Sequence, residues 1–233
     1  MVRKSVISEN EMRSLGGTVI FRIVFLVVLI GLFTLPPAGT FDFWQLYVYL
    51  LFMIIPLMTA LVYFIVNDPR LLMRRMHTRE KEKEQKAIQL TFTLFFLSAF
   101  VVSGLDRRFG WSDVPSAAVL AADFLGLMGY TLIFFVLKQN SYASRVVEVD
   151  KGQHVISDGL YGVIRHPMYA GVIIMWIPIP VALGSLPGLI PMASVPVLFI
   201  LRILNEESVM KRELPGYEDY CVKTKYRLIP FVW

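Results

Sequence analysis

The sequence contains very little cysteine and histidine, and this excludes several kinds of site. Cys221 is the only cysteine among 233 residues, and there are three histidines. One cysteine cannot form an internal disulfide or a cysteine zinc site, and the histidines show no metal-ligand spacing. No glycine-rich fingerprint for a dinucleotide or a phosphate follows a strand pattern. We therefore expect neither a metal centre nor a Rossmann-type domain.

Charge is also scarce, which argues against a soluble domain. Charged residues make up 18% of the chain and hydrophobic residues 56%, and the mean hydropathy is +0.60. Several apolar runs reach about 20 residues, the length that spans a membrane as a helix. The formal net charge is +5, and the basic residues lie in loops beside these runs. This placement indicates membrane topology and not nucleic-acid binding. No small-residue cleavage site follows the first run, so we expect no cleaved signal peptide.

The apolar runs predict an all-α, polytopic transmembrane bundle of five to six spans. Four spans are expected at residues 17–35, 43–66, 88–105 and 115–137, and the first should stop at Pro36 and Pro37. Residues 168–204 are long enough for two more spans folded as a helical hairpin, with its turn at residues 184–188. We divide the chain into residues 1–137, with a basic loop at 67–87, and a core at 138–233.

The distribution of lysine and arginine predicts the orientation. Basic residues gather before the first span, in the loop at 67–87, after the fourth span and in the C-terminal tail. Loops rich in lysine and arginine face the cytoplasm. We therefore expect an integral membrane protein with both termini and the active site on the cytoplasmic side.

Two polar clusters bracket the hairpin. The first is the run GLYGVIRHPMYAG at residues 159–171, and the second is RILNEE at residues 202–207. Polar side chains at membrane depth are costly and usually functional. Pro167 suits the first turn of a helix, whose free N–H groups favour an anion. Together the clusters predict one pocket for a cofactor at the cytoplasmic face.

Each cluster also has an ordinary structural interpretation. Arg165 can extend its side chain to the membrane–water interface, with Tyr161 and Tyr169 as an aromatic belt there. Arg202 lies four residues before Glu206, so the two can pair along one helix face. Alternatively, Arg202 binds an anionic substrate.

Residues 146–233 resemble the isoprenylcysteine carboxyl methyltransferase family and the wider group of membrane phospholipid methyltransferases. The resemblance lies in the order and spacing of QHVISDGLY at 153–161, RHPMYAG at 165–171, Glu206–Glu207, PGYEDY at 215–220 and RLIPF at 227–231. It covers about 40% of the chain. The run NDPRLL at residues 67–72 is similar to prokaryotic members.

The resemblance implies S-adenosylmethionine as cofactor, bound without a Rossmann domain. It implies cofactor contacts at Gln153, His154, Val155, Ile156, Tyr161, His166, Pro167, Met168, Tyr169 and Glu207, and a polar residue near Glu148. Arg165, Arg202, Glu206 and Glu207 are the candidate catalytic residues. The chemistry agrees, since His166 suits the carboxylate of the cofactor, Glu207 its ammonium, and tyrosine faces its sulfonium. In the family an arginine precedes the glutamates, but here Ile203 holds that position and Arg202 lies one residue earlier.

The implied reaction is carboxyl O-methylation of a lipophilic, isoprenylcysteine-like acceptor. A phospholipid amine or a small thiol remains open as the acceptor. Membrane sterol reductases that use NADPH carry a similar Arg-His-Pro-x-Tyr-x-Gly signature, which is a second reading. A third is a transporter or scaffold, with helices broken around Pro178 and Pro196.

Overall fold

The computed structural model describes residues 9–76, 83–143 and 153–233, and within these ranges it is helical with no strand. Five helices are long and apolar enough to cross a membrane. Each has 24 or 25 residues, about 36 Å at 1.5 Å per residue, against a hydrocarbon core of about 30 Å. This confirms the all-α polytopic bundle. The five are Leu15–Ala38, Trp44–Asn67, Lys86–Phe109, Ser116–Gln139 and Leu189–Glu213.

Large apolar side chains cover the outer faces of these helices. Phe21 on α1 (Glu9–Ala38) is 69% exposed, Val62 on α2 (Trp44–Asn67) is 61% exposed, and Leu94 on α4 (Lys83–Phe109) is 61% exposed. Proteins in water rarely expose apolar surface on this scale. The chain is therefore an integral membrane protein whose outer surface faces lipid.

Helix α1 continues through Pro36 and Pro37, where the sequence predicted a stop. The prolines lie in its last turn, against α4. A Cβ on Gly104 of α4 would lie 2.4 Å from the carbonyl oxygen of Thr34, so the two backbones touch. This packing holds the proline-containing turn in helical form, as neighbouring helices do in membranes. The helix ends only at Gly39, whose φ of +66° suits glycine.

In the second half of the molecule, α5 (Ser116–Gln139) packs closely against α7 (Pro167–Trp176). A Cβ on Gly129 would lie 2.5 Å from the Met175 backbone nitrogen. A Cβ on Gly171 would lie 2.7 Å from the Ile133 side chain. Small residues permit such contacts between membrane helices. As a result α5 fixes the position of α7 and of the polar residues just before it.

The predicted hairpin is present. Its first limb is α7 followed by the short α8 (Ile179–Ala182), and its second is α9 (Leu189–Met192) followed by α10 (Ser194–Glu213). Gly184, with a φ of +73°, lies in the turn between them. The first limb, Pro167–Ala182, is shorter than the five spanning helices. The described residues thus contain five full-length spans and one shorter apolar limb.

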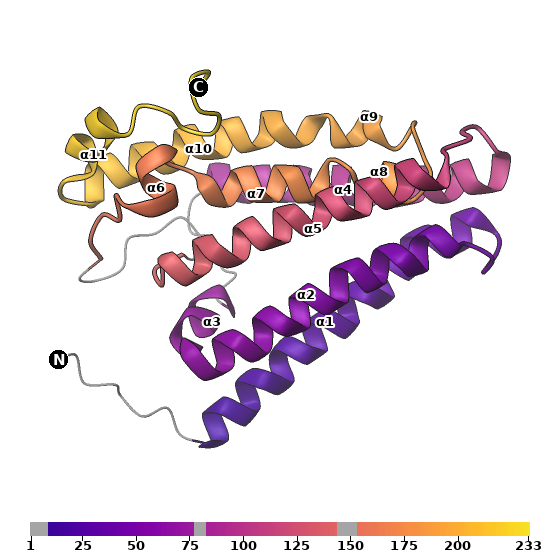
Figure 1. Cartoon of the computed structure of the whole chain (residues 1–233), viewed down its shortest axis with the longest axis horizontal. Helices are drawn as coiled ribbons and strands as arrows, with labels where there is room; N and C mark the ends of the chain where they lie inside the picture. The colour runs from indigo at the N-terminus through magenta and orange to yellow at the C-terminus, as the bar shows by residue number, and fades with distance from the viewer. Residues whose placement is uncertain (1–8, 77–82, 144–152) are drawn as a thin grey trace.

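Three short helices outside the hairpin gather at one end of the bundle (Figure 1). These are α3 (Pro69–Met76), α6 (Gly159–Val163) and α11 (Tyr217–Lys223), and they lie at the end where α1 begins. Glu148 and part of the basic loop at residues 67–87 fall outside the described residues.

At the opposite end of the bundle, Asp106 accepts hydrogen bonds from the backbone N–H (2.8 Å) and the hydroxyl (2.7 Å) of Ser112. The Ser112 hydroxyl in turn accepts from the Leu186 N–H (3.1 Å), which ties two loops together.

Candidate active site

Three segments meet at the end of the bundle that holds α3, α6 and α11, which we call the polar end. They are the start of α7, the C-terminal half of α10 and the C-terminal tail. The N–H of Arg165 donates to the carbonyl of Tyr226, and the N–H of His166 donates to the carbonyl of Arg227, both at 2.9 Å. His166 then caps α7, and Pro167 opens it where a missing N–H breaks no intrahelical bond. The backbone alone thus fixes Arg165 and His166 against the tail.

The Glu207 carboxylate is the centre of this arrangement. It is buried, with 3% of the residue exposed. Its Oε1 accepts a hydrogen bond from Arg165 Nε at 2.7 Å and lies 3.2 Å from His166 Nε2. Its Oε2 accepts from Arg227 Nε at 2.9 Å. One carboxylate therefore joins α7, α10 and the tail.

The cluster carries more positive than negative charge. Arg165 also donates to the carbonyls of Thr224 (2.7 Å) and Lys225 (2.9 Å). Burial lowers the pKa of its guanidinium, but the hydrogen bond and charge of Glu207 raise it above the ordinary value overall, so it stays charged. Two guanidinium groups, from Arg165 and Arg227, face the single carboxylate. This excess of positive charge favours an anionic ligand.

We call Glu207 and the three side chains that contact it, Arg165, His166 and Arg227, the Glu207 node. A second group of polar side chains, the Tyr169 node, forms around the Tyr169 hydroxyl. It accepts a hydrogen bond from Arg202 Nε at 2.9 Å and donates a short one to the Glu206 carboxylate. The Tyr169 ring stacks on His166, with centroids 5.7 Å apart, and contacts Phe199 at 5.0 Å. Arg202 and Glu206 thus meet on a residue of α7, and the stacked rings join this node to the Glu207 cluster.

Helix α6 is fastened beside the two nodes through Tyr161. The Tyr161 hydroxyl accepts from the Asn140 side chain (2.9 Å), and its carbonyl accepts from the Tyr220 hydroxyl (2.8 Å). Burial raises the pKa of Tyr161 to about 12 and also raises that of Tyr220, so both phenols stay neutral. Gly159 has a φ of +51°, and a Cβ there would lie 2.6 Å from the Gln139 amide. The positive φ and the nearby amide both favour glycine at this turn against α5.

The structure brings most of the sequence-predicted residues together. Arg165, His166 and Glu207 are in direct contact, and Tyr169 joins Arg202 and Glu206. Adjacent Glu206 and Glu207 face different partners, as expected for residues about 100° apart on a helix.

The remaining predicted residues lie around this centre or turn away from it. Val155 packs beside Tyr161 against the α11 tyrosines, while Gln153 and Ile156 are half-buried in the same segment. His154 is exposed and contacts the Tyr142 ring at 5.3 Å. Met168 packs towards the apolar cluster of α1, α2 and α3.

Two residues of the site have no role that the sequence predicts. Arg227 belongs to the RLIPF motif at residues 227–231, and in the structure it binds Glu207. Asn140 follows α5 and holds Tyr161, and nothing in its surroundings in the sequence singles it out. Both depend on contacts over 20 residues or more along the chain.

The donor set fits the charged groups of S-adenosylmethionine. A carboxylate offers about four lone-pair sites, and Arg165, His166 and Arg227 occupy three on Glu207. One remains for an ammonium, and the surplus guanidinium charge suits a carboxylate. The stacked His166 and Tyr169 rings offer π faces to a sulfonium. Among the described residues, no group of three or more histidine, cysteine, aspartate or glutamate side chains could hold a metal.

The comparison with protein families gives one match. A family model described as phospholipid methyltransferase matches residues 117–215. This range runs from the start of α5 to just beyond α10, so it includes both nodes except for Arg227. No curated protein matches the sequence. The match favours the methyltransferase reading over the reductase and transporter readings.

Proposed function

We propose that this membrane protein is a methyltransferase that O-methylates the carboxylate of a lipophilic, isoprenylcysteine-like acceptor. The match of residues 117–215 to the phospholipid methyltransferase model and the five membrane-spanning helices support the proposal. S-adenosylmethionine, the donor that this family implies, supplies an electrophilic methyl group on its sulfonium when bound. The observation that carries the proposal is the pair of adjoining nodes, one on Glu207 and one on Tyr169.

The active site and both termini face the cytoplasm in this proposal. The polar end of the bundle holds α3, α6 and α11 together with the start of α1 (Figure 1). Basic residues concentrate in the segments at this end, including Arg74 and Arg75 on α3 and Lys211 and Arg212 on α10. The positive-inside rule assigns such an end to the cytoplasm, where a soluble cofactor is present.

The Glu207 node holds the cofactor. Arg165 and Arg227 bind the cofactor carboxylate, and Glu207 both aligns the two guanidinium groups and accepts from the ammonium. The ring faces of His166 and Tyr169 lie against the sulfonium. Because Glu207 is buried, these charges act in a site from which water is largely excluded, which strengthens them.

The Tyr169 node positions the acceptor. Arg202 lies more than one helical turn deeper in the bundle than Glu207 and is half-buried. A guanidinium there suits an acceptor carboxylate that arrives from the membrane with its lipid tail. A carboxylate is already ionised at neutral pH and needs no general base. The residues then accelerate the transfer by orienting acceptor and methyl donor and by excluding water.

A phospholipid amine is the second candidate acceptor, and the description of the matching family favours it. An ammonium must lose a proton before it attacks. Glu206, which accepts a hydrogen bond from the Tyr169 hydroxyl, is the carboxylate of this node that suits that task. A small thiol would need the same help, since its ordinary pKa is above 8.

The test measures transfer of labelled methyl groups by the detergent-purified protein to three acceptors. These are an S-farnesyl cysteine derivative with a free carboxylate, phosphatidylethanolamine and an alkyl thiol. A methyl ester releases labelled methanol in base, whereas N-methyl and S-methyl products do not. We expect base-labile product with the farnesyl acid and a loss of more than tenfold in Arg202→Gln, but not in the exposed control Arg212→Gln. Base-stable label on the phospholipid alone would transfer the assignment to N-methylation.

A further inference from the structure

A buried carboxylate lies in the apolar bundle far from the active site. Asp123 is on α5 and only 3% exposed. Neither carboxylate oxygen has a hydrogen-bond partner among the described residues. Asp123 lies 16 residues before Gln139, about 24 Å along the helix at 1.5 Å per residue. Gln139 is the end of α5 that contacts α6, so Asp123 belongs to the opposite half of the membrane.

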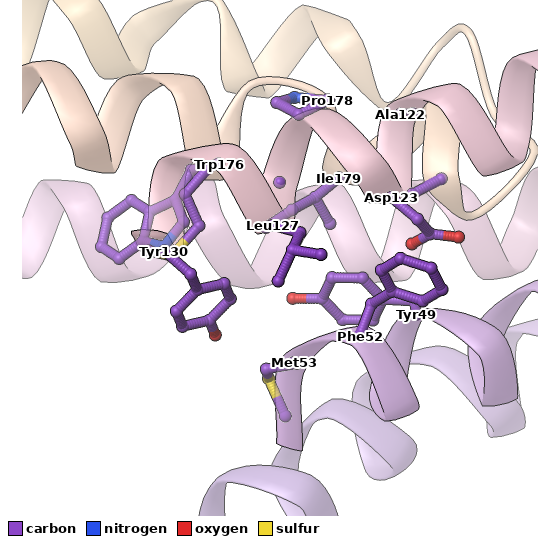
Figure 2. Close-up of a pocket in the computed structure, with 13 residues that line it drawn as sticks. Tyr49, Phe52, Met53, Ala122, Asp123, Leu127, Tyr130, Trp176, Pro178 and Ile179 are labelled. Carbon is purple, nitrogen blue, oxygen red and sulfur yellow. The ribbon is translucent and has the colours of Figure 1, made fainter. Parts of the chain in front are cut away.

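The carboxylate borders a small cavity of about 20 Å³ between α2, α5 and the first limb of the hairpin. In Figure 2 it points towards the rings that α2 contributes, Tyr49 and Phe52. Tyr130 and Trp176 line the pocket as well. Four aromatic rings therefore share one pocket with one acid.

The lining contains no lysine, arginine or histidine among the residues described. The pocket thus offers one carboxyl group and several π faces, and no cation of its own. Unpaired ionisable groups within membrane spans are costly and mark functional sites. A carboxylate beside aromatic faces is the combination that recognises an ammonium group, by charge and by cation–π attraction.

We propose that the Asp123 pocket is a second binding site, which takes the ammonium group of a membrane-partitioning amine. The apolar rest of the pocket, which includes Met53, Leu127 and Ile179, contacts the aliphatic part of the ligand. Asp123 lies seven residues from the start of α5, about 10 Å along the helix. A single-chain amine can reach this depth from the membrane face.

This inference does not depend on the methyl acceptor. Its test contains no S-adenosylmethionine, so its outcome is separate from that of the proposed function. Octyltrimethylammonium is titrated calorimetrically into the intact protein in a neutral maltoside detergent, with a micelle blank. Octanol serves as the neutral ligand of matched tail. The variants are Asp123→Asn and, as an exposed acid on the preceding loop, Asp113→Asn.

We expect saturable ammonium binding by the wild type and by Asp113→Asn, at least tenfold weaker binding by Asp123→Asn, and no saturable binding of octanol. Thermal melting checks that each variant is folded. Trp176→Leu keeps the acid and removes a π face, so it should also weaken ammonium binding and provides a second test if Asp123→Asn does not fold. Equal ammonium affinity of wild type and of folded Asp123→Asn or Trp176→Leu, or equal affinity for octanol, would overturn the proposal.

Discussion

The two ion pairs that share the Glu207 carboxylate should contribute unequally to stability. In the Arg165–Glu207 pair the side chains are 5% and 4% exposed, whereas Arg227 is 29% exposed. Removing one partner of a buried pair costs about 3–5 kcal/mol, because the other charge stays buried. Exposed pairs contribute only about 0–1 kcal/mol. We therefore expect Arg165→Gln to lower the free energy of unfolding by about 3–5 kcal/mol and Arg227→Gln by about 1–2 kcal/mol.

The assay is a pair of double-mutant cycles with Glu207→Gln, followed by chemical denaturation in detergent. The coupling energy should be about 2–3 kcal/mol for Arg165 with Glu207 and about 1 kcal/mol or less for Arg227 with Glu207. The exposed Arg212–Glu213 pair, with side chains 62% and 44% exposed, is the control and should show no coupling above about 0.5 kcal/mol. Equal coupling for both Glu207 pairs would mean that burial does not determine the strength of these ion pairs.

Three other outcomes test separate parts of the account. Gly129→Ala should destabilise the bundle by about 1–3 kcal/mol in thermal melting, because its Cβ would lie 2.5 Å from the backbone of α7. The control Gly126→Ala, whose Cβ would lie 3.7 Å from the nearest atom, should change the melting temperature little. Burial raises the pKa of the Cys221 thiol, so maleimide labelling of this single cysteine should be slower than that of free cysteine at pH 7 and should approach it only as the pH rises towards the higher pKa. Tyr169→Phe keeps the ring and removes the hydroxyl that joins α7 to α10. A hydrogen bond to a charged group contributes about 1.5–3 kcal/mol, so methyl transfer should fall by about 10–100-fold. An unchanged kcat/KM would remove the Tyr169 node from the mechanism.

The helices could be predicted because lipid imposes strict demands on the sequence. Each span needs about 20 apolar residues with internally bonded backbone, and all four N-terminal spans and the hairpin appear where hydropathy predicts them. The predicted end of α1 was wrong, because the helix includes Pro36 and Pro37. The packing of Gly104 against its last turn, which holds the prolines in the helix, is a tertiary contact. A local rule for proline cannot include that contact.

The candidate site could be predicted in part, because its residues cluster in short motifs at the ends of spans. Arg165 and His166 are adjacent in the sequence, and Glu207 follows one hairpin later. The roles of Arg227 and Asn140 depend on how the tail and α6 fold back, which no local pattern indicates. Asp123 interrupts an apolar run, but its neighbours in the pocket come from helices remote in sequence.

Calorimetry on the detergent-purified protein can show whether the Glu207 node holds S-adenosylmethionine. Wild type is measured beside Glu207→Ala and His166→Ala, with Glu218→Ala as an exposed acid control. We expect micromolar binding by wild type and by Glu218→Ala, and loss of binding in the two site variants. Absence of binding to folded wild type, or unchanged binding in folded Glu207→Ala, would mean that this node does not hold the cofactor.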